Sequence, residues 1–440
     1  MKVFKFGGAS VNSADAVRNM AQIVQQHLET TPLVVVVSAM GKTTNLLEKL
    51  VPGTQESAAE KQELRRQLEA YHRGIASALM PDNQDVQHKI DSLLADLDQR
   101  CATLPADAEH YNYNYDQTVS FGELLSTTII ADYLNALGIN TLWADARQLI
   151  KTDSHYREGI VDWKATQEAT RSFLDSVDNF HQVILTQGFI GGTTQRSIGS
   201  TESPTSVLNS QFSTTTLGRE GSDYSAAVLA YCLDAESVTI WKDVPGFLNA
   251  DPKFFQNTVK IEQIPYNEAI ELAYYGASVI HPKTVKPLQN KSIPLHIKSF
   301  LDPAAAGSTV GGYATIQPLT PLYIFKNKQI LISIQPRDFS FIAEENLQTI
   351  FATLADLNIR VNMMQNTALS FSICIDDNVI LLEQLTERLQ HSFNVRYNRN
   401  LQLITIRYYT ADIIQDIVAG RSILLQQRTR STAQLVVAEK

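Results

Sequence analysis

A lysine and two glycines near the N-terminus have a spacing that suits anion binding. Lys2–Phe6 has the pattern of a strand, and Gly7 and Gly8 follow it directly, before a helical segment. Adjacent glycines let backbone N–H groups approach a bulky anion closely, and Lys5 adds a compact positive charge at the same point. Taken alone, these residues fit equally well a tight strand-to-helix turn with an incidental lysine.

A denser cluster of the same kind lies in the middle of the chain. Gly188, Gly191 and Gly192 follow one strand pattern, and the run 214–225, TTTLGREGSDYS, introduces the next helix. Glycines, hydroxyls and one arginine near a helix N-terminus are typical of a phosphate or carboxylate cradle. Asp223 alone could be a capping residue, but capping does not require the whole cluster, so the pattern favours a functional site.

Two further segments place polar groups at the start of helices. Ser38–Thr44 contains Gly-Lys-Thr, but a P-loop also needs a glycine where Val36 stands, so that interpretation is rejected. Its hydroxyls still suit a substrate site at the carboxyl end of a strand. Glu123 lies in the first turn of another helix, where it either responds to the helix dipole or offers a carboxylate to an ammonium group.

The loop Trp241–Lys253 mixes apolar groups with lysine and aspartate beyond a strand, which suits a nucleotide base and ribose or simply a long connecting turn. No His/Cys metal-ligand spacing is present, and His155 and His281 are expected to be structural. A phosphate-bound Mg²⁺ needs few protein ligands, so a magnesium requirement is left open.

The elements that must position these residues alternate between strands and helices over the first 300 residues. This order predicts an α/β fold with a mostly parallel sheet covered by helices. Residues 55–101 lack strand signals and predict two long helices inserted into that pattern. In residues 193–216, 13 of 24 are Ser or Thr, which predicts a mobile loop that is either a lid or a plain insertion.

The C-terminal part has a different pattern. Residues 325–398 predict a βαββαβ unit, and residues 399–440 predict a second, partial unit that stops at βαββ. Both are of the ferredoxin-like type. The predicted domains are therefore a catalytic domain over 1–305 and two smaller units.

Composition excludes several classes of protein. The 440 residues carry a formal net charge of −9 with no dense basic block, which argues against nucleic acid or an anionic membrane as the main partner. The longest aliphatic run, Leu33–Val37, is far too short to span a bilayer. The three cysteines are widely separated, which predicts a reducing compartment and a cytoplasmic protein.

In order along the chain, the motifs KFGGAS, SAMGKTTNLL, SFGELLS, TQGFIGG, TTTLGREGSDYSAA, WKDVPGFLNADPK and YGASVIHPKT resemble those of the aspartokinases. The resemblance covers residues 1–310 and implies the amino acid kinase fold, followed by paired regulatory ACT domains. It also implies the phosphorylation of L-aspartate by ATP with Mg²⁺ to give 4-phospho-L-aspartate, which leads toward lysine, threonine and methionine. A homodimer or larger homo-oligomer, and an amino acid effector at the ACT region, are implied as well.

The resemblance also implies roles for single residues. Lys5 would neutralise charge on the transferring phosphoryl group, with Asp223 orienting it. The phosphate-binding positions are Gly7, Gly8 and Ser222. Arg219 would bind the α-carboxylate of aspartate and Glu123 its α-ammonium, with Thr44 in the same pocket. Nucleotide-contacting positions are Lys5, Lys242, Asp243, Leu248, Lys253, Ser278 and Val279.

Some residues depart from the family pattern. Ala9 replaces a hydroxyl residue, Leu248 replaces an aromatic, and Glu220 adds a negative charge that we expect to point away from the anion site. In the first ACT unit, Arg360 and Asn362 replace smaller or acidic residues, and the turn over 336–345 lacks glycine, which argues against feedback by lysine.

Two alternative functions remain open at this point. One keeps the fold but phosphorylates glutamate, N-acetylglutamate or another acid. The other is an amino acid sensor without catalysis, against which the intact Lys5 and Asp223 argue.

Overall fold

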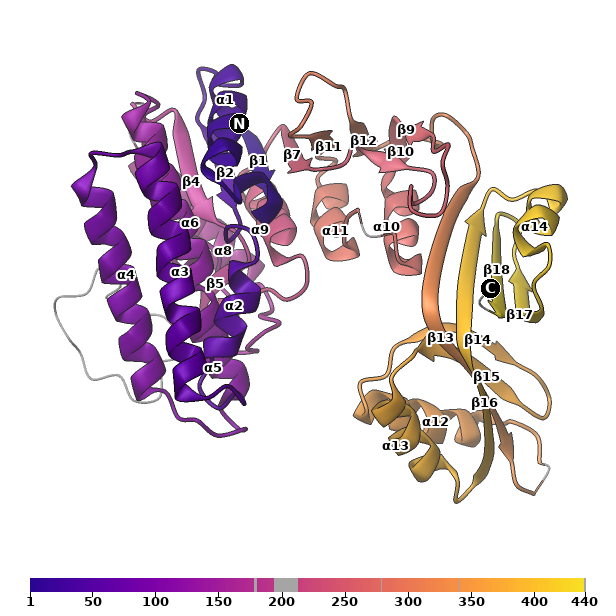
Figure 1. Ribbon diagram of the computed structural model, residues 1–440. Helices are drawn as coiled ribbons and strands as arrows, with labels where there is room; N and C mark the ends of the chain where they lie inside the picture. Colours follow the sequence, from indigo (N-terminus) through magenta and orange to yellow (C-terminus); the bar gives the residue numbers. More distant parts are fainter. Residues whose placement is uncertain (178–179, 194–212, 278, 339, 439–440) are drawn as a thin grey trace. The chain divides into compact units, whose positions relative to one another are not determined.

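The computed structural model describes the chain except for residues 178–179, 194–212, 278, 339 and 439–440 (Figure 1). Two compact units divide it. The first comprises residues 1–247, 260–270 and 279–317, and the second comprises 248–259, 271–278 and 318–440. The predicted boundaries at 305, 325 and 398 remain predictions.

An eight-stranded sheet organises the first unit, in the order β10-β12-β11-β7-β1-β2-β4-β3. All neighbouring pairs are parallel except β11 and β12, which confirms the predicted mostly parallel sheet. The strands are β1 (Lys2–Phe6), β2 (Leu33–Val37), β3 (Thr141–Ala144), β4 (Val183–Gln187), β7 (Ser237–Lys242), β10 (Gln263–Pro265), β11 (Leu295–Ser299) and β12 (Ser308–Gly311).

The side chains of β1 alternate between the hydrophobic core on one face of the sheet and the candidate site residue Lys5 on the other. Phe4 and Phe6 enter the large hydrophobic cluster that the sheet shares with neighbouring helices. Because successive side chains of a strand point to opposite faces, Val3 and Lys5 lie on the other face. Helix α9 (Gly221–Cys232) packs against β1, β2 and β7 and provides a partner for Lys5 there.

Helices of the first unit cover the sheet and extend one side of it. The predicted insertion is confirmed as two long helices, α3 and α4, which pack side by side and against α6 (Figure 1). Ser57 and Glu60 form a capping box that fixes the start of α3. The helices are α1 (Ala14–Gln26), α2 (Thr43–Leu50), α3 (Ala58–Leu79), α4 (Gln84–Thr103), α5 (Tyr111–Val119), α6 (Phe121–Ala136), α7 (Ala146–Leu149), α8 (Trp163–Ser176) and α11 (Pro282–Asn290), with the 3₁₀ turn η1 (Gly8–Val11). Helix α10 (Tyr266–Tyr275) contributes its first five residues to this unit and its last five to the second.

Two short strands at the ends of the Ser/Thr-rich segment form a small hairpin. Strands β5 (Ile190–Thr193) and β6 (Ser213–Thr216) pair in antiparallel fashion, with Ile190 opposite Thr216. The loop between them, for which the sequence predicts a lid or an insertion, lies outside the described residues from 194 to 212.

The second unit contains a six-stranded antiparallel sheet in the order β14-β15-β13-β16-β18-β17. Its strands are β13 (Leu322–Pro336), β14 (Val361–Asn366), β15 (Phe371–Asp376), β16 (Phe393–Arg407), β17 (Ile423–Arg428) and β18 (Thr432–Ala438). Its helices are α12 (Glu344–Asp356), α13 (Val379–Leu389) and α14 (Ala411–Val418). Separate hydrophobic clusters form around α12 with α13 and around α14, in agreement with two ACT-like halves.

One of the two central strands of this sheet, β16, differs from the prediction. The sequence predicts separate short strands at 394–397 and 401–408, whereas β16 is continuous and pairs along almost all of β13. The pairing register shifts between Lys326 and Gln329, and Lys328 and Asn400 there have left-handed φ values of 54° and 57°. This irregularity interrupts the alternation of side chains and explains why one strand looks like two.

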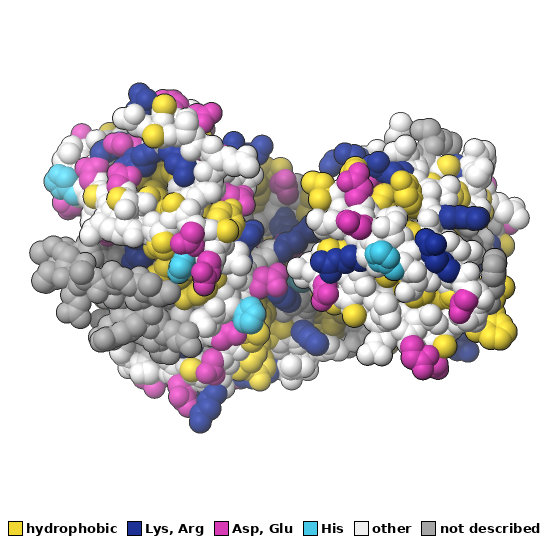
Figure 2. All heavy atoms as spheres, turned by 90° about the horizontal axis from the view of Figure 1, so that it is seen from below, with side chains coloured by type: hydrophobic (Ala, Val, Ile, Leu, Met, Phe, Trp, Pro, Cys, Tyr) yellow, Lys and Arg dark blue, Asp and Glu magenta, His cyan; other side chains and the backbone are white. Residues whose placement is uncertain are grey.

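Two surface properties follow. Within the described residues, every helix is too short or too polar to cross a membrane. On the face drawn in Figure 2, acidic and basic side chains are interspersed rather than gathered by sign.

Candidate active site

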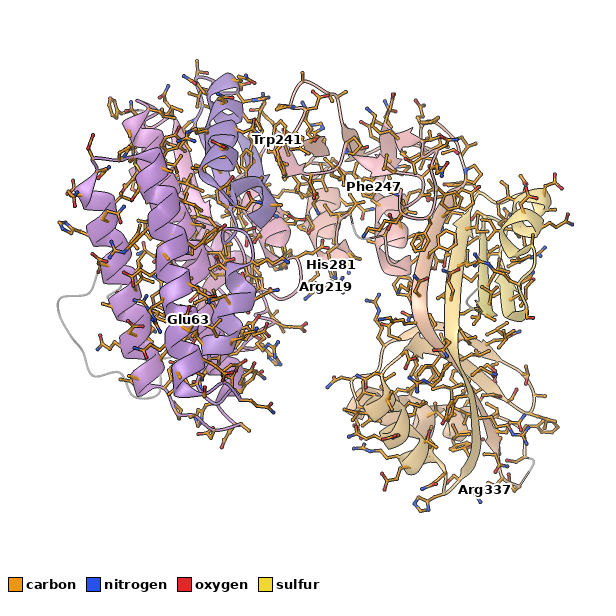
Figure 3. All side chains as sticks on the ribbon, in the orientation of Figure 1. Glu63, Arg219, Trp241, Phe247, His281 and Arg337 are labelled. Carbon is orange, nitrogen blue, oxygen red and sulfur yellow. The ribbon has the colours of Figure 1, made fainter. Side chains whose placement is uncertain are left out.

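Two lysines share one buried carboxylate at the carboxyl ends of β1 and β7. Lys5 Nζ lies 2.6 Å from Asp223 Oδ1, and Lys242 Nζ lies 3.2 Å from Asp223 Oδ2. Lys242 Nζ also donates to the backbone oxygen of Val279 at 2.5 Å. These strands are neighbours with Phe6 opposite Trp241, so Lys242 follows the last position of β7 that pairs with β1. Trp241, labelled in Figure 3, stacks on Phe6 with ring centroids 6.0 Å apart.

The charge state of Asp223 follows from its neighbours. Burial favours the neutral acid, but the positive charges of Lys5 and Lys242 outweigh it and hold the pKa of Asp223 below its usual range. The carboxylate is therefore ionised at neutral pH. The cluster of Lys5, Lys242 and Asp223 therefore contains two ammonium charges and one carboxylate charge, apart from any charge on surrounding residues.

Close backbone approaches explain the glycines around this cluster. A Cβ on Gly8 would lie 2.8 Å from the backbone oxygens of Ala39 and Gly41, and one on Gly188 would lie 2.5 Å from Ser222 Cβ. A Cβ on Gly7 would lie 3.3 Å from Lys5 Nζ. Larger residues would separate these segments, so Gly8 allows the turn after β1 to meet the loop after β2, and Gly188 allows the loop after β4 to meet the N-terminus of α9.

Glu123 lies in the first turn of α6, in the interior of the first unit. Its Oε1 accepts a hydrogen bond of 3.2 Å from the Ala39 backbone N–H, while its buried Oε2 has no hydrogen-bond partner among the described residues. Burial raises the pKa of Glu123 to about 8, although the Ala39 N–H and the positive charge of Lys5 act in the opposite direction. A buried carboxylate is costly unless it is paired, so this oxygen suits a cationic hydrogen-bond donor such as an ammonium.

Asp116 and Gln117 of α5 form hydrogen bonds with β6, the strand that precedes Arg219. Neither is among the predicted site residues. Asp116 accepts hydrogen bonds from the backbone and hydroxyl of Thr216, at 2.8 and 2.7 Å, and from the Arg157 backbone at 2.9 Å. The Gln117 side chain donates a hydrogen bond to the Thr214 backbone oxygen and accepts one from the Thr214 backbone N–H. Burial raises the pKa of Asp116 to about 7 against these hydrogen bonds. Nothing in the local sequence marks Asp116, because its partners lie 41 and 100 residues away.

Glu220 disagrees with the expectation that it points away from the anion site. Its φ of 53° is left-handed, and its buried Oε2 has no hydrogen-bond partner among the described residues. Burial raises the pKa of Glu220, the charge of Lys242 opposes this, and Asp223 reinforces it. The carboxyl group of Glu220 therefore lies close enough to Lys242 and Lys5 to interact with them electrostatically. Arg219 beside it is exposed on the loop before α9 (Figure 3).

The remaining predicted residues divide by location. Ser222 is buried at the start of α9, and Thr44 is partly exposed in the first turn of α2, whereas its neighbour Thr43 is buried. Asp243 is exposed directly after β7.

Leu248 and the exposed Lys253 belong to the second compact unit, and Ser278 is outside the described residues. Their predicted nucleotide contacts therefore stay predictions.

The arrangement can bind anions at one point and a cation at another. The lysine pair and the glycine-lined turns provide positive charge and backbone N–H groups, which suit phosphate oxygens. Glu123, influenced electrostatically by Lys5, provides a carboxylate for an ammonium. No group of three or more His, Cys, Asp or Glu residues that could hold a metal occurs in the described ranges.

Comparison with known proteins supports this architecture over most of the chain. Residues 1–299 match the amino acid kinase family. The lysine-sensitive aspartokinase 3 of Escherichia coli K12 is 30% identical over 422 residues, covering 92% of this chain and 86% of that protein.

Solved structures agree with the sequence match. Aspartokinase III of E. coli in complex with aspartate and ADP, in its R-state, superposes with a TM-score of 0.82 at 26% identity, covering 100% of this chain and 96% of that one. The T-state of the same enzyme with lysine and aspartate gives a TM-score of 0.79 at 27% identity over the same shares of the two chains. Because the family match covers residues 1–299 and the match to aspartokinase 3 covers most of both chains, the chain belongs to the amino acid kinase family and, within it, to the aspartokinases.

Proposed function

We propose that the protein is an aspartate kinase that transfers the γ-phosphoryl group of ATP to the β-carboxylate of L-aspartate. The products are ADP and 4-phospho-L-aspartate, at the start of the route to lysine, threonine and methionine. The observation that carries the proposal is the pair of lysines on Asp223 in the same unit as Glu123, whose buried oxygen has no partner among the described residues.

Substrate orientation follows from the charges of a free amino acid. Glu123 binds the α-ammonium, Arg219 binds the α-carboxylate, and Thr44 lies in the same pocket. The β-carboxylate is already ionised at neutral pH, so no general base is needed. One carboxylate oxygen forms a bond to phosphorus while the bond from phosphorus to the bridging oxygen of ADP breaks. Catalysis then depends on alignment and on stabilising charge at the phosphoryl oxygens.

The phosphate end uses the groups that already converge there. Lys5, held by Asp223, faces the transferring phosphoryl group, and the N–H groups of Gly7, Gly8 and Ser222 bind its oxygens. Both carboxylate oxygens of Asp223 form ion pairs with lysines. Mg²⁺ fits this site as an ion held mainly by nucleotide phosphates, where it neutralises phosphate charge.

The nucleotide is assigned to the predicted positions Lys5, Lys242, Asp243, Leu248, Lys253, Ser278 and Val279. A homodimer or larger assembly and an amino acid effector at the ACT-like halves complete the proposal. The Arg360 and Asn362 positions argue against lysine as that effector.

A hydroxylamine-trapping assay tests the proposal directly. Purified protein with ATP, Mg²⁺ and L-aspartate should form aspartyl hydroxamate, and glutamate or N-acetylaspartate in place of aspartate should not. N-acetylaspartate is the sharper control, because it keeps both carboxylates and lacks only the ammonium assigned to Glu123. Equal turnover of N-acetylaspartate would contradict that assignment, and no product with any acid would favour the sensor hypothesis.

A further inference from the structure

We propose that Asp116 is a positioning residue for the substrate aspartate, because it holds the segment that carries Arg219 against the helices that carry Glu123. The inference rests on the proposed kinase function and deepens it. In this role Asp116 acts through Arg219 and does not itself touch the substrate.

The carboxylate of Asp116 is fully buried, and both of its oxygens accept hydrogen bonds. Oδ1 accepts from the Thr216 hydroxyl at 2.7 Å, and Oδ2 accepts from the backbone N–H groups of Thr216 and Arg157 at 2.8 and 2.9 Å. A carboxylate is costly to bury without such donors. The three donors come from two segments far apart in sequence, so Asp116 fastens both segments to α5.

The two segments held by this carboxylate also carry the turn that leads to Arg219. The Gly159 N–H donates to the Thr216 backbone oxygen at 2.8 Å, which joins the segments to one another. Gly218 lies between Thr216 and Arg219 with a left-handed φ of 76°, and a Cβ there would lie 3.3 Å from the Arg157 backbone oxygen. The backbone that presents Arg219 therefore packs directly on Arg157.

Consecutive helices connect the same carboxylate to Glu123. Helix α5 ends at Val119 and α6 begins at Phe121, so a single residue separates the helix of Asp116 from the helix of Glu123. The α-ammonium and α-carboxylate of an amino acid are attached to one carbon, so the groups that bind them must be held at a fixed separation. The Arg219 side chain is exposed, so its position depends on the backbone that Asp116 holds.

A double-mutant cycle of Asp116→Asn with Arg219→Ala tests whether Asp116 acts through Arg219. Asparagine keeps the shape of aspartate but replaces one acceptor oxygen with a donor, which faces the donors of Thr216 or Arg157. We expect Asp116→Asn to lower kcat/KM for aspartate about tenfold or more, through a raised KM for aspartate, with the KM for ATP changed less than about threefold. In the Arg219→Ala background the same substitution should change kcat/KM for aspartate less than about twofold, because both changes remove one interaction.

A second variant and a matched control separate positioning from general stability. Thr216→Val keeps the branched shape and removes only the hydroxyl that donates to Oδ1, so it should raise the KM for aspartate less than Asp116→Asn does. Asn114→Ala is the control, because this equally buried residue of α5 donates to the Pro105 backbone oxygen at 2.6 Å rather than to β6. It should leave the KM for aspartate unchanged even if thermal melting shows a loss of stability.

The inference is overturned by a wild-type KM for aspartate in Asp116→Asn, by an equal rise in the KM of both substrates, or by the same rise in Asn114→Ala. An undiminished effect of Asp116→Asn in the Arg219→Ala background would also overturn it, since the two residues would then act independently. If Asp116→Asn does not fold, Thr216→Val in both backgrounds decides by the same criteria. Failure of the wild type to phosphorylate aspartate would instead overturn the proposed function, and this inference with it.

Discussion

The two units each contain a cluster of buried polar side chains, but they satisfy these side chains differently. In the second unit, Asn362 donates to Gln329 at 2.9 Å and to Asp376 at 2.8 Å, and it accepts from Lys326 at 2.9 Å. Gln329 in turn donates to Asp376 at 2.8 Å. In the first unit, Glu123 and Glu220 each keep one buried oxygen without a partner in the described residues.

This difference distinguishes a structural cluster from a binding site. Buried polar groups that bond one another stabilise a single packing, whereas a buried oxygen without a partner loses its hydration without compensation. The network around Asn362 is therefore typical of a structural cluster, whereas the oxygens of Glu123 and Glu220 that are unpaired within the described residues can accept hydrogen bonds from a ligand. The comparison predicts that substitutions in the first cluster change catalysis and that substitutions in the second change stability.

The largest effect is expected for Lys5→Ala. Removing the ammonium that faces the transferring phosphoryl group should lower kcat by about 10²-fold or more, because its stabilisation is greatest in the transition state. The measurement is hydroxamate formation under saturating ATP and aspartate. Lys2→Ala, on the same strand, should keep normal turnover, and normal turnover in Lys5→Ala would remove Lys5 from the mechanism.

Glu123 should give the next largest effect, with a characteristic pH dependence. Its pKa of about 8 means that the free enzyme carries a neutral acid below this pH and a carboxylate above it. Since the carboxylate binds ammonium better, kcat/KM for aspartate should rise from pH 6.5 to 8.5.

Glu123→Gln should abolish this rise and lower kcat/KM at pH 8.5 by about tenfold or more, as for a lost charged hydrogen bond. The KM for ATP should stay near its wild-type value. An unchanged pH profile in the variant would show that another group causes the rise.

The second cluster should respond in stability alone. Asn362→Ala removes three hydrogen bonds from a buried network, which should lower the free energy of unfolding of the second unit by about 1–3 kcal/mol. Urea denaturation measures this, and kcat should not change. Asn366→Ala, exposed near the end of the same strand β14, is the control. A selective loss of kcat in Asn362→Ala would break the comparison.

The sequence predicts the elements of the first unit well because local patterns determine them. Phe4 and Phe6 alternate with Val3 and Lys5, and this alternation already places the lysine on the face away from the main core. The position of Lys242 on Asp223 was not predictable, since it depends on the pairing of β1 with β7.

Partners that are distant in sequence explain the other differences. Asp116 acts on residues 41 and 100 positions away, and the continuity of β16 depends on its pairing with β13. The direction of Glu220 depends on a left-handed turn that no local rule assigns to a glutamate.

The left-handed turn at Glu220 gives the prediction with the smallest expected effect. It also distinguishes an effect of charge from an effect of backbone strain. Glu220→Gly should stabilise the folded backbone by about 1 kcal/mol, because glycine accepts a φ of 53° without a Cβ clash. It should also lower the KM for ATP a few-fold by removing an acidic group near Lys242 and Lys5. Glu220→Ala removes the same charge but keeps the backbone strain. A lower KM in both variants with higher stability in glycine alone would assign the first effect to charge and the second to the turn. If neither variant changed the KM, the carboxylate would not act on bound nucleotide, and the contrast between the two clusters would rest on Glu123 alone.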